Sequence, residues 1–379
     1  MAFVRLDEVI KRVHTKVDKD NTDLIYYVGG EHIDSEIIRV TKRGLIEGST
    51  IGPMFYYGFK AGDFLLVSRN PHLKKAGVVG FDGICSEKTF VLNTVDERRL
   101  LPEFLPFILQ NDLFWDYAYR HRHGSTNTFI NWSTLASYEF ELPDLDTQRQ
   151  LATVLWSIND TMEAYKKLIS ATDELVKSQF IERFGKPGTD PYEWGITTLG
   201  ECCVLNPRRP REMNTNIDYS FVAMSSVSED GRIVASIERP YPEICKGFTY
   251  FAENDVLFAK ITPCMENGKG GVAKGLKNGA GFGSTEFHVL RPINGISDPY
   301  WLYIITMFPK FRSDAEKVMT GTGGQRRVPI TYLSEYRIAL PPIELQKQFA
   351  AYVQQSDKSK FAVMKCLRSQ CNTLLAMKI

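Results

Sequence analysis

The sequence of 379 residues has no excess of either charge and no long apolar run. Lys and Arg number 46 against 45 for Asp and Glu, which excludes a polycation that binds nucleic acid through bulk charge. Residues 1–8 lack the basic end and apolar stretch of a signal peptide, and no window approaches the roughly eighteen uncharged apolar residues of a membrane span. We therefore expect a soluble, cytoplasmic protein with no membrane partner, in which any DNA binding comes from local basic clusters.

Signatures of metal and thiol chemistry are also missing. The seven cysteines include no C-x-x-C pair, and their odd number and varied contexts indicate reduced cytosolic thiols. The six histidines include no H-E-x-x-H motif, and no set of Cys and His has zinc spacing. We therefore expect no metal site.

Catalytic motifs are equally scarce. The segments that begin at Asn70-Pro71 and Asn206-Pro207 lack the second proline and the aromatic residue of an amino-methyltransferase loop. The glycine-rich run at 268–275 lacks the Gly-Lys-Ser/Thr ending of a phosphate-binding loop, so it reads as a turn between strands. We expect a chain that is not an enzyme and binds no cofactor itself.

What the sequence does contain is an internal repeat. Tyr138 and Gln148 have counterparts in Tyr336 and Gln346, and each pair is 198 residues apart. Upstream, residues 86–92 match 284–290, and residues 62–65 match 254–257 with a small shift. Because 379 residues also exceed the usual length of one domain, we interpret the chain as a duplication.

Each half has the same internal order, in which short alternating apolar runs are followed by a long helical segment. Residues 145–184 contain no Gly or Pro, and the Gly185-Lys186-Pro187-Gly188 segment then ends the helix. The counterpart begins at Ile343, directly after Pro341-Pro342. This order predicts four parts, namely a globular domain at 1–144, a helix at 145–185, a second domain at 186–342 and a second helix at 343–379.

The two predicted helices carry apolar residues at heptad-like spacing. The first seam comprises Leu151, Leu155, Ile158, Met162, Tyr165 and Ile169 and continues imperfectly through Thr172, Val176 and Gln179; the second includes Phe349, Val353 and Leu367. One interpretation is that each helix lies on its own domain. We favour a pair that links the halves, because some forty residues at about 1.5 Å each reach roughly 60 Å, beyond a small domain's width.

The arrangement of two globular halves, each followed by a long helix that an aromatic-x-x-x-Leu-Pro strand end and a Gln introduce, resembles the specificity subunit of type I restriction-modification systems. The most specific local matches are residues 81–90, 260–269 and 281–287. The resemblance implies a mixed α/β fold, with two similar target-recognition domains related by pseudo-twofold symmetry and joined by two long antiparallel coiled-coil helices.

The resemblance also implies a function. Each domain would read a few base pairs of a bipartite double-stranded DNA target, and the helices would act as a spacer that docks two methyltransferase subunits. Restriction motor-nuclease subunits would translocate and cleave the DNA. S-adenosylmethionine, ATP and Mg²⁺ are expected on those partner subunits and not on this chain.

Recognition domains need cations for phosphates, and polar side chains for base edges. Loops at 120–127 and 320–327 occupy matching places in the two halves, as do segments at 68–75 and 260–269, and residues 208–211 add a basic turn. The candidate DNA contacts are Arg69, Asn70, His72, Lys74, Lys75, Arg120, Arg122, His123, Ser125, Thr126, Asn127, Arg208, Arg209, Lys260, Thr262, Glu266, Asn267, Lys269, Thr322, Gln325, Arg326 and Arg327. The alternative for 120–127 is the solvated end of an aromatic helix at 104–119, and for 208–211 a solvated turn.

Three alternative functions remain open on the sequence. The chain could be the recognition subunit of a compact type II-like restriction-methylation enzyme. It could also be a methyltransferase or nuclease with a degenerate motif, which would bind S-adenosylmethionine by itself. A coiled-coil scaffold with protein-binding ends would tolerate neutralisation of Gln325, Arg326 and Arg327 without loss of DNA binding.

Overall fold

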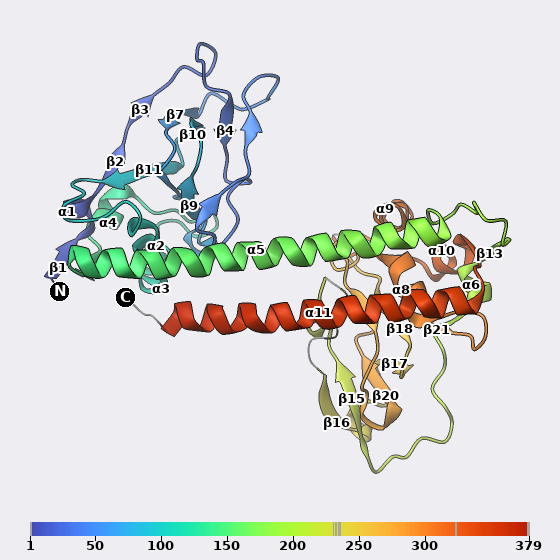
Figure 1. Ribbon diagram of the computed structural model, residues 1–379. Helices are drawn as coiled ribbons and strands as arrows, with labels where there is room; N and C mark the ends of the chain where they lie inside the picture. The colour runs from blue at the N-terminus through green and yellow to red at the C-terminus, as the bar shows by residue number, and fades with distance from the viewer. Residues whose placement is uncertain (1, 230, 232, 234–235, 323, 377–379) are drawn as a thin grey trace. The chain divides into compact units, whose positions relative to one another are not determined.

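The computed structural model describes residues 2–229, 231, 233, 236–322 and 324–376, with side chains beyond Met364 described only at Cys366. The chain forms two compact units (Figure 1). Unit 1 comprises Met1–Lys166 with Lys365–Ile379, and unit 2 comprises Lys167–Met364. Over the described helices, no segment combines the length and apolar character needed to cross a membrane.

Unit 1 contains an inner sheet in the order β2-β11-β8-β9-β5, an outer sheet in the order β3-β7-β10-β4-β6, and the short pair β1-β12. The inner strands are β2 (Ile10–Val13), β11 (Thr89–Thr94), β8 (Phe64–Val67), β9 (Ala76–Val79) and β5 (Arg39–Val40). The outer strands are β3 (Thr15–Lys16), β7 (Phe55–Phe59), β10 (Gly83–Ser86), β4 (Tyr26–Val28) and β6 (Gly44–Leu45), and the short pair is β1 (Ala2–Arg5) with β12 (Glu139–Leu142). The helices are α1 (Leu6–Val9), α2 (Leu105–Leu109), α3 (Asp112–Arg120), α4 (Trp132–Ala136) and the first part of α5 (Leu145–Phe184), and Pro71–Leu73 forms the 3₁₀ turn η1.

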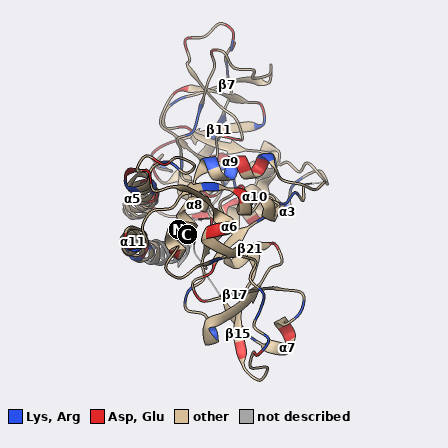
Figure 2. Cartoon of the chain, turned by 90° about the vertical axis from the view of Figure 1, so that its right-hand side faces the viewer, with Lys and Arg blue, Asp and Glu red and all other residues tan. Residues whose placement is uncertain are grey.

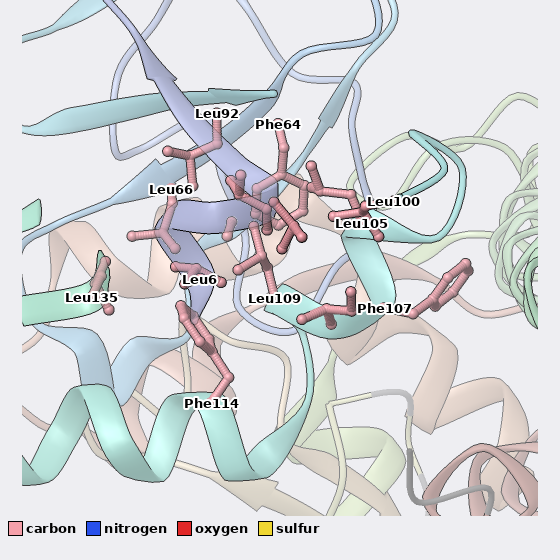
Figure 3. Close-up of a cluster of buried hydrophobic side chains, with 14 of the residues drawn as sticks. Leu6, Phe64, Leu66, Leu92, Leu100, Leu105, Phe107, Leu109, Phe114 and Leu135 are labelled. Atoms are coloured by element: carbon pink, nitrogen blue, oxygen red, sulfur yellow. The ribbon is translucent and has the colours of Figure 1, made fainter. Parts of the chain in front are cut away.

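Strand β8 is apolar at every position because both faces of the inner sheet are covered. Phe64 and Leu66 pack into a core formed with the helices, where Leu105 and Phe114 also lie (Figure 3). The alternate residue Leu65 packs into a second core between the two sheets. The helices and the outer sheet therefore hold the inner sheet from opposite sides.

Unit 2 repeats this plan, with sheets in the orders β14-β21-β18-β19 and β16-β15-β20-β17 and the pair β13-β22. Its strands are β13 (Ile196–Thr198), β14 (Cys203–Leu205), β15 (Asp218–Val222), β16 (Ile237–Pro240), β17 (Thr249–Ala252), β18 (Val256–Ala259), β19 (Gly270–Val272), β20 (Ala280–Gly283), β21 (Phe287–Pro292) and β22 (Arg337–Ala339). Its helices are the second part of α5, α6 (Leu199–Cys202), α7 (Tyr241–Ile244), α8 (Pro299–Met307), α9 (Pro309–Lys317), α10 (Ile330–Glu335) and the first part of α11 (Ile343–Ala376), with 3₁₀ turns η2 (Met224–Ser226) and η3 (Lys277–Gly279).

The strand pairings confirm the mixed α/β fold and the two similar units. Strand β11 pairs antiparallel with β2 and β8, as β21 pairs with β14 and β18. In the outer sheets, β10 runs parallel to β4 and antiparallel to β7, as β20 does to β15 and β17. The pseudo-twofold relation between the units stays a prediction.

A buried glutamine fixes each long helix to its unit by the same contacts. The Gln148 side chain accepts from the Leu101 N–H at 3.0 Å and donates to the carbonyls of Arg99 and Pro143. The Gln346 side chain accepts from the Asp298 N–H at 2.9 Å and donates to the carbonyls of Ile296 and Pro341. Both glutamines are 0% exposed, so the repeated Gln of the sequence is a structural residue.

The predicted aromatic helix at 104–119 is wrong as one continuous helix, because α2 and α3 are separate. Asn111 caps α3 by accepting the Leu113 N–H, and the Gln110 side chain donates to two carbonyls outside the helix, those of Ile37 and of Ala76 in β9. Polar side chains that bond backbone groups outside a helix interrupt it in this way.

Helices α5 and α11 run antiparallel within unit 2 (Figure 1). Phe184, near the end of α5, packs against Phe349 near the start of α11, whereas Asp173 pairs with Lys360 further along. Val176, Phe180 and Phe184 are buried four residues apart, so the seam of α5 passes through Phe180 and not through the predicted Gln179.

The remaining predicted seam residues divide between the two units. Leu155 is buried in the helix core of unit 1 with Leu151 packed against it, and Phe349 and Val353 are buried in the core of unit 2. Ile158, Met162, Tyr165 and Ile169 are partly buried. The Leu367 side chain lies outside the described residues. Helix α5 therefore packs on unit 1 near its start and on unit 2 near its end, as expected of a helix that links the halves, and α11 packs on unit 2 near its start.

Candidate nucleic-acid interface

In each unit the structure brings two of the predicted segments together. In unit 1 the segment after β8 (68–75) pairs with the loop after α3 (120–129), through bridges from Phe129 to Arg69 and His123. In unit 2 the segment after β18 (260–269) pairs with the loop after α9 (320–327), through bridges from Arg327 to Ile261 and Thr320. We call these segments the paired loops of each unit.

The same backbone hydrogen bonds hold both sets of paired loops. In unit 1 the Ile130 N–H donates to the Ser68 carbonyl at 2.9 Å, and the Asn70 N–H donates to Thr128 at 2.7 Å. In unit 2 the Val328 N–H donates to Lys260 at 2.9 Å, and the Thr262 N–H donates to Arg326 at 3.0 Å. The frame of the loops is therefore duplicated, while the side chains on it differ.

A glycine at matching places closes the second loop of each pair. Gly124 has a φ of +84° and Gly321 a φ of +125°, which L side chains rarely adopt. A Cβ at Gly124 would lie 3.0 Å from the Asn127 carbonyl oxygen, and one at Gly321 would lie 2.6 Å from that of Gln325. These glycines allow tight turns. The turns set the direction of the side chains that lie between each glycine and the bridging residue, Phe129 or Arg327.

The paired loops of unit 1 present many of the predicted contact residues to solvent. Exposed positions are Arg69, His72, Arg120, His123, Ser125, Thr126 and Asn127, and Asn70 is half-buried. The Arg122 guanidinium stacks on the Tyr119 ring and donates to the Tyr119 carbonyl at 2.6 Å. The exposed side chains of these loops include cations, hydroxyls and an amide, which suit both phosphates and base edges.

Two predicted contacts in unit 1 are bound within the protein instead. The Lys74 ammonium pairs with Glu36 at 3.0 Å and Asp112 at 2.7 Å. The Lys75 ammonium donates to the Gly30 carbonyl at 2.7 Å. Both lysines therefore tie the loop to neighbouring elements and are less available to DNA than Arg69 or Arg120.

In unit 2 the two arginines of the second loop have different surroundings. The Arg327 guanidinium forms a bidentate pair with Glu286, at 2.9 Å from both Nε and Nη2. Arg326 reaches Glu316 at 3.5 Å and Glu266 at 3.8 Å, which are long contacts for ion pairs. Thr322 and Gln325 are exposed. Arg326 and Gln325 are thus the freer side chains of this loop.

A buried arginine holds the first loop of unit 2 by hydrogen bonds to its backbone. Arg312, from α9, donates to the Met265 and Gly268 carbonyls, and burial lowers the pKa of its guanidinium to about 10. The Thr262 hydroxyl donates to Glu266 at 2.8 Å, and Asn267 is exposed at the turn. Lys269 donates to the Met224 carbonyl at 3.4 Å, and Lys260 is half-buried. Of this predicted cluster, Asn267 is the most open to a ligand.

The basic turn at 208–211 is only partly free. Arg208 is exposed, whereas Arg209 donates to the Tyr241 hydroxyl at 2.9 Å and to the Cys245 carbonyl at 2.8 Å. Arg209 therefore anchors the turn to α7.

Three supporting residues were not predicted from the sequence. Glu286, His288 and Arg312 hold the paired loops of unit 2, but they belong to distant segments. Glu286 lies in the 281–287 segment that resembles the family, and this resemblance was the sequence signal that could have pointed to it. Helix α9, which carries Arg312, contains both basic and acidic residues (Figure 2). In the described part of the chain, no group of three or more His, Cys, Asp or Glu could hold a metal ion.

We expect stability of the second unit to depend on pH through His288. This ring bonds the Val328 carbonyl at 2.9 Å and Asn206 at 3.2 Å, and burial lowers its pKa below the usual 6.5, against the raising effect of the Val328 carbonyl. The folded state therefore favours neutral His288, so its contribution is present above pH ~6.5 and is lost as the pH falls below that value. Denaturant unfolding should show a smaller loss of stability between pH 7 and 5 in His288→Phe than in the parent. An equal loss in both would contradict this role.

The second half of the chain is similar in sequence to known proteins. Residues 191–371 match the family described as the type I restriction modification DNA specificity domain. The chain is 36% identical over 191 residues to the type I restriction enzyme EcoEI specificity subunit of Escherichia coli, and 34% identical over 197 residues to the EcoAI specificity subunit of the same organism. These alignments cover 48% and 49% of this chain, but only 32% and 33% of those curated relatives.

The whole chain also shares a fold with a solved structure. The crystal structure of a type I restriction-modification system S subunit from M. genitalium matches 99% of this chain and 94% of its own, with a TM-score of 0.57 and 14% sequence identity. At that identity the match shows the fold alone. The second half of the chain is therefore similar in sequence to the type I restriction modification DNA specificity domain, and the whole chain is similar in fold to a solved S subunit.

Proposed function

We propose that this chain is a non-catalytic, sequence-specific DNA-binding subunit that reads a bipartite double-stranded target and directs partner enzymes to it. The observation that carries the proposal is the pair of loops present in both units. The backbone frame is the same, but His123 and Phe129 stand in unit 1 where Thr320 and Arg327 stand in unit 2. A duplicated frame with different side chains suits two half-sites of different sequence.

The parts of the chain have separate roles in this proposal. Residues 1–144 and 186–342 are the target-recognition domains, and 145–185 and 343–379 are the spacer helices. Arg69, Arg120 and Asn127 are the leading contacts of the first domain, and Gln325, Arg326 and Asn267 those of the second. The spacer sets the separation of the half-sites, which lie about one DNA turn, ~34 Å, apart when read from one face.

Two methyltransferase subunits are the partners that we propose for the spacer helices. Leu168 and Leu175, one heptad apart on α5, are each 52% exposed, so this helix has apolar side chains left for a partner. In the assembled cytoplasmic complex the partner subunits, which include motor-nuclease subunits, would hold S-adenosylmethionine, ATP and Mg²⁺. The relatives named as type I restriction enzyme specificity subunits support this assignment.

The test is the base preference of the complex at each half-site. With the full chain and its methyltransferase partners, Gln325→Ala with Arg326→Ala should reduce discrimination at one half-site about tenfold and leave the other unchanged. Arg120→Ala with Asn127→Ala should do the reverse. Arg98→Gln serves as a control, because this 89% exposed side chain lies outside the paired loops. If both loop variants retained the parental preference at both half-sites, the proposal would fail.

A further inference from the structure

The Arg327 side chain is fully engaged by the protein. Its Nε and Nη2 each donate to Glu286 at 2.9 Å, and its Nη1 donates to the Gln325 carbonyl at 3.1 Å. Glu286 ends the turn directly before β21, so the pair ties the second loop of unit 2 to the inner sheet. An arginine held by all three of its nitrogens is poorly placed to read a base.

Unit 1 has no such ion pair at the matching positions. Lys88 precedes β11 as Glu286 precedes β21, and Phe129 bridges the loops as Arg327 does. Each of these pairs is 198 residues apart, the separation of the sequence repeat. The Phe129 ring packs against the His123 ring with centroids 5.6 Å apart. The same loop is therefore held by ring contacts in unit 1 and by charges in unit 2.

We propose that Glu286 and Arg327 form a positioning clasp that sets the direction of Arg326 and Gln325, so that sequence readout by unit 2, and not by unit 1, depends on an ion pair. This inference rests on the proposed function of the paired loops. It assigns Arg327 a positioning role in place of the base contact expected from the sequence.

The surroundings of the clasp support this role. Thr320 and Arg327 exchange two backbone hydrogen bonds, at 3.0 and 2.8 Å, and His288 bonds the carbonyl of the next residue, Val328. In an extended segment neighbouring side chains point to opposite sides. Arg327 points to Glu286, in the turn before β21, and Arg326 points the other way, toward Glu266 and Glu316. Fixing Arg327 therefore fixes the side from which Arg326 leaves the backbone.

The ion pair of the clasp is partly exposed to solvent and its dissolved ions. The side chains of Arg327 and Glu286 are 40% and 24% exposed, so dissolved salt screens their attraction. The ring contact in unit 1 has no charge pair to screen. Readout by the two units should consequently respond differently to salt, beyond the general weakening that phosphate contacts cause in both.

The experiment compares Glu286→Gln, Arg327→Gln and the exchanged variant Glu286→Arg with Arg327→Glu in the full chain with its methyltransferase partners. Base preference is measured at each half-site, together with affinity for DNA lacking the site. We expect Glu286→Gln to reduce preference at one half-site about tenfold while affinity for non-specific DNA is kept, because Arg327 is freed as a cation. The exchanged variant should recover most of the preference. Lys88→Gln, the matched change in unit 1, should leave that half-site unaltered.

A second readout needs no DNA. Amide hydrogen exchange at Thr320 and Arg327 should speed up in Glu286→Gln, and the exchanged variant should reverse the effect. Unchanged exchange, or equal loss of preference at both half-sites, would overturn the clasp. Absence of any sequence preference in the parent complex would instead overturn the proposed function, and the readout role of the clasp with it.

Discussion

Replacement of Gln346 by Leu should destabilise unit 2 by about 3 kcal/mol or more. The side chain is 0% exposed and satisfies the Asp298 N–H and the carbonyls of Ile296 and Pro341. Leucine fills a similar volume but leaves these three groups without this partner; the Pro341 contact is buried and the other two are part-buried, and an unsatisfied buried group costs about 1–3 kcal/mol. Denaturant unfolding of the full chain measures the loss, and hydrogen exchange shows which unit carries it.

Matched variants make this test specific. Gln355→Leu, at an exposed position of the same helix, should change the unfolding free energy by less than about 0.5 kcal/mol. Gln148→Leu should reproduce the loss in unit 1, because Gln148 makes the equivalent contacts there. A loss below ~1 kcal/mol, or one spread evenly over both units, would contradict the account.

Replacement of Lys360 by Ala should cost about 2 kcal/mol. This lysine is 7% exposed between α5 and α11 and pairs with Asp173 at 2.7 Å and Asp357 at 2.8 Å. Removing one member of a buried pair costs about 3–5 kcal/mol, which we reduce because both carboxylates are about one third exposed. The remaining carboxylates would also repel each other. Lys358→Ala, at an exposed position of α11, is the matched control.

The pH dependence and a double variant sharpen the Lys360 prediction. Burial acts to lower the pKa of Lys360, but Asp357 and Asp173 raise it above its usual value. The contribution is therefore fully present at neutral pH and is lost as the pH rises through the raised pKa. Adding Asp173→Ala to Lys360→Ala should restore part of the stability. Strictly additive losses in the double variant would show that the two residues do not interact.

The repeat and the long helices could be predicted because they depend on local patterns. The constant separation of Gln148 and Gln346 reflects two identical hydrogen-bond networks. The absence of Gly and Pro allowed the helix α5 to be predicted. The predicted seam position Gln179 was wrong because heptad spacing applies to a supercoil. Val176, Phe180 and Phe184 instead pack at four-residue spacing in the helix core of unit 2.

The candidate site could be predicted as loops but not as individual contacts. Glycines and basic residues pointed to the segments that the structure pairs. Which cations are free depends on partners far away in the sequence, such as Asp112 for Lys74 and Glu286 for Arg327. Local composition does not contain that information, and spacing alone could not have separated Arg326 from Arg327.

The most direct test of the central claim is selection from random double-stranded DNA by the full chain with its methyltransferase partners. The account predicts enrichment of two short blocks of different sequence, separated by a spacer of constant length within about one helical turn. Enrichment of a single contiguous block, or no enrichment over random DNA, would contradict it.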